Sequence, residues 1–203
     1  RRTQGWIIED DYDGEYRYSG APLAPLAALD QHGRVLYVGT FGKIAFPALR
    51  LGYLVLPPAL AKPFSQGRAL ASRHSEISSQ CVMAEFMARG HFQRHIRRMR
   101  KAALARRDAI LAGWPTGILG MGAMPDIAAG LHVTLAVDNV SRERALVAQA
   151  EAVGVEVTPL SHFCLDDSTR PVDKRAGLVV GFAAVPEREI AEALLKLRKA
   201  WRS

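Results

Sequence analysis

The first 56 residues contain three short apolar runs, and these limit the possible folds more than any other feature. The first run, 6–8, leads directly into the acidic residues 9–11. The second, 35–38, ends at Gly39 and Thr40, and the third, 51–56, is stopped by Pro57 and Pro58. Short apolar runs of this kind are typical of buried strands. We therefore predict three strands at the edge of a larger α/β sheet, the first with functional groups at its carboxyl end.

The rest of the chain predicts helices and a second, smaller α/β unit. Helices are expected over 59–71, 78–88, 91–114 and 141–153 and from 186 onward, with Ser78 and Ser79 capping the second. Strands are expected over 131–137, 155–160 and 178–182. We predict the carboxyl part of a large domain (1–90), a long connecting helix (91–114) and a small α/β domain (115–203). A doubly wound sheet needs more strands than the first half supplies, so we expect a larger parent protein.

Composition excludes several classes of protein. No apolar run approaches the roughly 18 residues of a membrane span, and the first residues lack the apolar core of a signal peptide. Cys81 and Cys164 match no disulfide, metal or redox spacing. The histidines show no metal-ligand spacing either, so no metal site is predicted. We expect a soluble, reduced, cytoplasmic protein that does not bind a membrane.

The net charge of +7 is unevenly distributed. Five carboxylates lie within 9–15, whereas 31–75 and 86–107 contain none. Blocks this local suggest a small anionic ligand or a partner surface as well as nucleic acid. The basic run over 94–107 is interpreted as a solvated helix face, because no groove-reading motif accompanies it. Tyr16, Arg17 and Tyr18 are interpreted as interface packing.

The strongest local signal is the segment from Gly39 to Lys43, directly after the second predicted strand. A phosphate-binding P-loop would need glycine six residues before the lysine and a hydroxyl residue after it. Tyr37 and Ile44 occupy those positions, which excludes a P-loop. The simplest interpretation is a surface lysine in a turn. However, apolar neighbours favour the neutral, nucleophilic form of an amine, as a Schiff-base lysine requires.

When the acidic residues 9–11 are considered together with the lysine segment, the chain resembles a known family. It is similar to the aminotransferase-like domain of MocR/GabR-type transcriptional regulators, which belong to the GntR family and use the fold type I aminotransferase scaffold. The resemblance covers nearly the whole chain. It is carried by WIIEDDYDGEYRY (6–18), GRVLYVGTFGK (33–43), PALRLGYLVLP (47–57), GHFQRHIRRMR (90–100) and GLHV (130–133). The implied fold is part of a pyridoxal 5'-phosphate-dependent transferase large domain followed by the small domain.

The resemblance implies a pyridoxal 5'-phosphate site. Lys43 would form the internal aldimine and Asp10 would pair with the pyridine nitrogen, keeping the ring an electron sink. Tyr12 would donate to the ring 3-oxygen, and Thr40 and Arg50 would hold the phosphate. Asp11 competes with Asp10 for the pyridine nitrogen. Asp10 is preferred because its spacing to the lysine fits the family better.

The sequence departs from the family pattern in four places. Gly42 stands where serine usually precedes the lysine, and Ile44 where a small or hydroxyl residue usually follows it. Ala103 replaces a tyrosine of the basic helix. Val179 replaces the arginine that clamps a substrate carboxylate in true aminotransferases, which removes a strong bidentate ion pair. Arg170 or Arg175, in the loop that precedes this strand, could substitute for that arginine.

The resemblance implies an effector domain that senses an amino compound through the Schiff base. A homodimer is implied, and DNA would bind only through an N-terminal winged-helix domain that this chain does not contain. The alternative function is a working class I/II aminotransferase, which the acid, tyrosine and lysine would equally serve. A further alternative is a truncated gene product without function. The effector and the operator cannot be predicted from the sequence.

Overall fold

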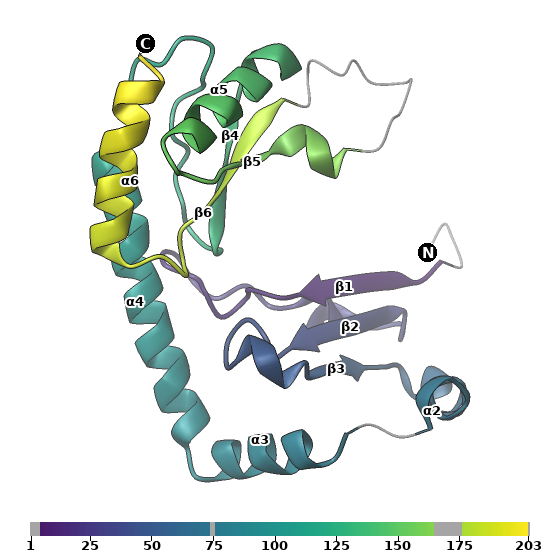
Figure 1. Ribbon diagram of the computed structural model, residues 1–203. Helices are drawn as coiled ribbons and strands as arrows, with labels where there is room; N and C mark the ends of the chain where they lie inside the picture. Colours follow the sequence, from purple (N-terminus) through teal and green to yellow (C-terminus); the bar gives the residue numbers. More distant parts are fainter. Residues whose placement is uncertain (1–4, 74–75, 165–175, 203) are drawn as a thin grey trace. The chain divides into compact units, whose positions relative to one another are not determined.

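The computed structural model describes residues 5–73, 76–164 and 176–202, and the chain divides into two compact units, Arg1–Met99 and Arg100–Ser203 (Figure 1). The boundary falls within the longest helix, α4 (His91–Gly113). No helix of the described residues is long and apolar enough to cross a membrane.

The first unit is built on a three-stranded sheet of β1 (Ile7–Asp11), β2 (Val35–Thr40) and β3 (Gly52–Val55). The strand order is β1-β2-β3, with β1 and β2 parallel and β2 and β3 antiparallel, as the arrows in Figure 1 show. Ile8 lies opposite Leu36, and Asp10 lies opposite Val38. The predicted strand positions are therefore correct within a few residues. The acidic residues, however, lie inside β1 rather than after it.

The prediction that β1 is buried is wrong for the described chain. The side chain of Ile8 is 71% exposed, whereas Leu36, its partner on β2, is 8% exposed. β1 is an edge strand with one neighbour among the described residues, so its apolar side chains lack a covering layer. β1 therefore has the apolar sequence of a buried strand, but no layer of the described residues covers its apolar side chains.

A short helix that the sequence analysis did not predict, α1 (Leu26–Leu29), lies between β1 and β2. The Glu9 carboxylate accepts hydrogen bonds from the backbone amides of Leu26, at 2.7 Å, and Ala27, at 2.9 Å. The first amides of a helix have no intrahelical partner, and a carboxylate satisfies them well. Glu9 therefore fixes α1 against β1 from 17 residues away.

Helices α2 (Pro58–Ser72) and α3 (Ser78–Ala88) follow the sheet, and α4 follows them. Ser78 and Ser79 do not cap α3 with their side chains as predicted. Instead, the Glu76 carboxylate accepts from the amides of Ser78 and Ser79, at 2.6 and 2.7 Å. These bonds lower the pKa of Glu76 to about 2, those of Ser79 contributing most.

The second unit is an antiparallel sheet of order β4-β6-β5 packed with helices. Its strands are β4 (His132–Ala136), β5 (Thr158–Pro159) and β6 (Gly177–Gly181). Its helices are α5 (Val140–Ala152), α6 (Glu187–Ala200) and the part of α4 from Arg100 onward. β5 is shorter than predicted, because a 3₁₀ helix, Leu160–Phe163, follows it at once. The apolar face of α6 is buried as its helical spacing predicts, through Ile190, Leu194, Leu197 and Trp201.

Glu143 is a fully buried carboxylate in the core of the second unit. It accepts hydrogen bonds from the amide and hydroxyl of Ser161 and, at 2.7 Å, from the amide of Gly177. A buried charge is tolerated when it is fully hydrogen-bonded. Glu143 thereby ties the first turn of α5 to both the 3₁₀ helix and the start of β6.

Candidate functional site

The carboxyl edge of β1 and β2 brings together the acidic and the lysine segments. Asp10 is in register with Val38 in the parallel ladder, and Thr40 ends β2 two residues later. Since side chains two residues apart on a strand share a face, Asp10 and Thr40 lie on the same face of the sheet. Asp10 is exposed and Thr40 is half-buried. Two of the five predicted site residues are thus placed together by strand register.

Asp11 lies on the opposite face. Its carboxylate accepts a hydrogen bond from the Tyr37 hydroxyl at 2.7 Å and another from the amide of Gly14 at 2.9 Å. Burial raises the pKa of Tyr37, and hydrogen bonds to Asp11 and Tyr53 raise it further. The Asp11 carboxylate therefore has a structural role, as the acceptor of these two hydrogen bonds. Of the two acids that competed in the sequence, Asp10 is the one on the face that carries Thr40.

Tyr12 follows β1 directly, and its side chain is exposed. The partial burial of Tyr12 raises its pKa, and the negative charges of Asp13 and Asp10 raise it further. The effect of Asp10 follows from its position two residues earlier, because a nearby carboxylate disfavours the phenolate. Tyr12 consequently stays a hydrogen-bond donor at neutral pH.

Lys43 occupies the middle of one helical turn. The amide of Ala45 donates to the carbonyl of Phe41 at 2.8 Å, and the amide of Phe41 donates to the carbonyl of Leu51 at 2.9 Å. The second bond closes the base of the loop that connects β2 to β3. The Thr40 hydroxyl accepts from the amide of Gly42 at 3.1 Å, so it can still donate its own proton.

The lysine side chain is exposed, which differs from the apolar setting expected from its neighbours. Ile44 is 2% exposed and takes the inward position of the turn. Adjacent residues of a helical turn point in different directions, so an apolar neighbour in sequence need not surround the amine. In the described chain, Lys43 faces solvent.

Arg50 lies on the same loop as Lys43, at the point where the chain turns into β3. It follows the 3₁₀ turn Pro47–Leu49 and has a φ of 48°, a left-handed conformation that is unusual for arginine. Its amide donates to the carbonyl of Pro47 at 3.3 Å, and its side chain is exposed. A residue held in this region is typical of functional loops.

Tyr16 is a part of the site that the sequence interpretation missed. It is 2% exposed, and its hydroxyl donates to the carbonyl of Lys43 at 3.1 Å. The two residues are 27 positions apart, and nothing in their spacing indicates the contact. The only local signal was an aromatic residue beside charged ones. Packing at an interface was therefore the wrong interpretation for Tyr16 in this unit.

Aromatic rings pack against the residues that flank the lysine turn in sequence. The ring centroids of Phe41 and Phe92 are 6.0 Å apart, and those of Phe46 and His95 are 5.6 Å apart. Phe41 also lies 5.2 Å from Tyr53 of β3. The first turns of α4 are thus packed against the residues before and after Lys43.

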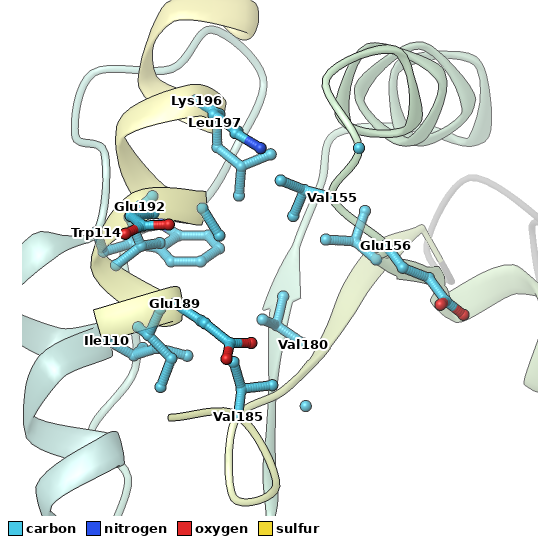
Figure 2. Close-up of a pocket in the computed structure, with 16 residues that line it drawn as sticks. Ile110, Trp114, Val155, Glu156, Val180, Val185, Glu189, Glu192, Lys196 and Leu197 are labelled. Carbon is cyan, nitrogen blue, oxygen red and sulfur yellow. The ribbon is translucent and has the colours of Figure 1, made fainter. Parts of the chain in front are cut away.

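The second unit contains a separate pocket of about 380 Å³ between α6, the end of α4 and the segment before β5 (Figure 2). Its lining is mainly apolar, with Ile110 and Trp114 on one side and Val155 on the other. Glu189 reaches from α6 toward Val180 in Figure 2. The sequence did not predict this pocket, and none of the five predicted site residues lines it.

Val179 lies within β6, opposite Thr134 of β4 and Thr158 of β5. It is half-buried in the sheet, so its side chain contributes packing to this strand and no charge. The predicted substitutes, Arg170 and Arg175, lie outside the described residues. Within the part of the chain that the structure describes, no group of three His, Cys, Asp or Glu side chains could hold a metal ion.

Comparison with solved structures identifies the class of fold. The chain superimposes on kynurenine aminotransferase of Pyrococcus horikoshii with a TM-score of 0.84 and 27% identity, over 97% of this chain and 48% of that enzyme. The fold is therefore that of fold type I aminotransferases, of which this chain matches about half. This confirms the predicted fold class. No protein-family profile matches the chain.

Comparison with curated sequences identifies the group within that class. The HTH-type transcriptional regulator YdeL of Bacillus subtilis is 38% identical over 200 residues, which is 98% of this chain and 42% of YdeL. The rhizopine catabolism regulatory protein MocR of Rhizobium meliloti is 31% identical over 200 residues, which is 98% of this chain and 40% of MocR. The chain is thus homologous to the aminotransferase-like domain of MocR-type GntR-family regulators, and spans about two fifths of the length of these relatives. The resemblance drawn from the sequence is confirmed.

Proposed function

We propose that this chain binds pyridoxal 5'-phosphate through Lys43 and serves as part of the effector domain of a MocR-type regulator that senses an amino compound. The observation that carries the proposal is the juxtaposition of Asp10 and Thr40 on one sheet face, with Lys43 following β2 three residues later. Ligand sites of open α/β sheets lie at the carboxyl ends of strands, where these residues are found.

The side chains suit such a cofactor chemically. When bound, pyridoxal 5'-phosphate supplies an aldehyde for an amine and a ring that accepts electrons. Asp10 would hold a proton on the ring nitrogen, and Tyr12, kept protonated, would donate to the ring oxygen. The Thr40 hydroxyl retains a free proton for a phosphate oxygen, and the exposed Arg50 guanidinium supplies positive charge.

The donors of the site are exposed, which fits a site that is completed by other parts of a longer protein. Asp10, Tyr12, Lys43 and Arg50 all face solvent in the described chain. The chain spans less than half of its relatives, so more than half of each relative lies outside the match. We propose that those parts, together with a second copy in a homodimer, supply the remaining contacts.

A regulator is favoured over a working aminotransferase by one residue. Val179 offers no charge where aminotransferases of this class bind the substrate carboxylate, so an amino acid would lose a bidentate ion pair. Relatives such as YdeL are HTH-type regulators, and more than half of YdeL lies outside the match. We accordingly propose that DNA binding in the cytoplasm belongs to another part of the parent protein. Transamination is the second candidate function, supported by the likeness to kynurenine aminotransferase.

The proposal is tested by titrating pyridoxal 5'-phosphate and following the visible absorbance of the lysine-bound form. Lys43→Ala should abolish that band, whereas Lys62→Ala, an exposed lysine of α2, should leave it unchanged. Borohydride reduction followed by peptide mapping should locate the cofactor on Lys43. A band that persists in Lys43→Ala and maps to another lysine would contradict the proposal.

Sensing and catalysis are separated by adding amino compounds to the loaded protein. A sensor should change its absorbance with little release of keto product, whereas an aminotransferase should form product over many turnovers. Sustained turnover with an amino acid would favour the second candidate function despite Val179.

A further inference from the structure

The backbone of Lys43 is held although its amine is exposed. The Tyr16 hydroxyl donates to the Lys43 carbonyl at 3.1 Å, and the tyrosine itself is buried. That carbonyl belongs to the helical turn closed by Ala45 and Phe41. The lysine side chain is a flexible four-carbon chain, so the region its amine can reach depends on where its backbone is held. The bond to the Lys43 carbonyl therefore limits the positions of the amine.

The residue pair Phe46 and His95 packs next to the lysine turn at its carboxyl-terminal end in sequence. Their rings pack with centroids 5.6 Å apart, and Phe46 lies three residues after the lysine. Arg98 donates to Nδ1 of His95 at 3.0 Å, which orients the imidazole, since a guanidinium can only donate. His95 is 7% exposed, so its position is fixed by packing as well.

We propose that Tyr16 and the Phe46–His95 pair form a lysine clamp, a set of positioning residues that places the neutral Lys43 amine for condensation with an aldehyde. In that condensation a C=N bond forms and the aldehyde oxygen leaves as water. The inference rests on the proposed function. Holding a nucleophile in the correct orientation favours bond formation, because less conformational and orientational entropy is lost when the two groups react. None of the three residues needs to touch the cofactor for this effect.

The test compares two ligands that differ in one respect. Pyridoxal 5'-phosphate carries the aldehyde that the lysine captures, and pyridoxamine 5'-phosphate has the same ring and phosphate without it. In the full chain, Tyr16→Phe should weaken pyridoxal 5'-phosphate binding about tenfold, equivalent to about 1.4 kcal/mol. Binding of pyridoxamine 5'-phosphate should change less than twofold. Tyr18→Phe, a nearby half-buried tyrosine, is the matched control and should change neither.

Phe46→Leu provides an independent variant, because Phe46 is largely exposed and its loss should not prevent folding. It should show the same selective loss as Tyr16→Phe. Unchanged binding of pyridoxal 5'-phosphate in both variants would overturn the clamp, and so would equal weakening of the two ligands. Failure of the proposed function looks different, since the unmodified protein would then give no band that depends on Lys43.

Discussion

The Tyr37 hydroxyl donates to the Asp11 carboxylate at 2.7 Å, on the face of the sheet opposite Asp10. Two neighbouring acids therefore have different environments. Asp11 is bound within the protein, by Tyr37 and by the amide of Gly14, and Asp10 is exposed at the edge where the lysine loop begins. This relationship separates a structural acid from a candidate cofactor ligand, and each has a testable consequence.

Exchange of the two acids for their amides should affect different properties of the protein. Asp10→Asn should weaken pyridoxal 5'-phosphate binding and shift its absorbance, because an amide does not keep the ring nitrogen protonated. Asp11→Asn should lower the free energy of unfolding by about 1–2 kcal/mol, as expected for loss of a charged hydrogen-bond acceptor. Denaturant unfolding and cofactor titration of both variants separate these outcomes. A stronger cofactor defect in Asp11→Asn than in Asp10→Asn would reverse the assignment.

Glu143→Gln should destabilise the second unit by about 2–4 kcal/mol, because it leaves buried donors poorly satisfied. The carboxylate holds Ser161 and Gly177 together, and an amide can accept with one oxygen only. Glu151→Gln, on the same helix but exposed, should change stability by less than about 0.5 kcal/mol. Thermal or denaturant unfolding gives both values. Equal stabilities for the two variants would show that the buried bonds contribute nothing.

The start of α3 should lose stability in acid. The pKa of Glu76 is lowered from 4.5 to about 2 by its bonds to Ser79 and Ser78, so its contribution is present above an unfolded-state pKa near 4.5. As the pH falls from about 4.5 toward 2, that contribution disappears. Amide hydrogen exchange at Ser78 and Ser79 should therefore accelerate over this range in the native sequence. In Glu76→Gln the exchange rates, corrected for intrinsic chemistry, should show no such pH dependence.

The 203-residue chain alone should bind pyridoxal 5'-phosphate more weakly than micromolar. Ile8 is exposed on β1 and Leu54 on β3, so the sheet has apolar surface that lacks a partner within the described residues. Missing two or three cofactor contacts, at about 1–3 kcal/mol each, weakens binding by several powers of ten. Titration combined with mass measurement of the oligomer checks this. Stoichiometric micromolar binding by a well-folded chain would contradict it.

Local sequence patterns determined most of the secondary structure. The bounds of α3 and the buried face of α6 agree with the prediction, because helical spacing and terminal glycines depend on neighbouring residues only. The segment from Gly39 to Lys43 and the acids of β1 identified the family for the same reason. The identity and sequence spacing of these residues were sufficient to recognise the family motifs.

Tertiary structure decided which side chains meet. Strand register placed Asp10 on the face of Thr40 and Asp11 on the other, whereas the sequence had favoured Asp10 only through its spacing to Lys43. The bond from Tyr16 to Lys43 joins residues 27 positions apart. Glu143 and Gly177 are 34 positions apart. Contacts at such separations arise only when the chain has folded back on itself, and periodicity within a short window carries no information about them.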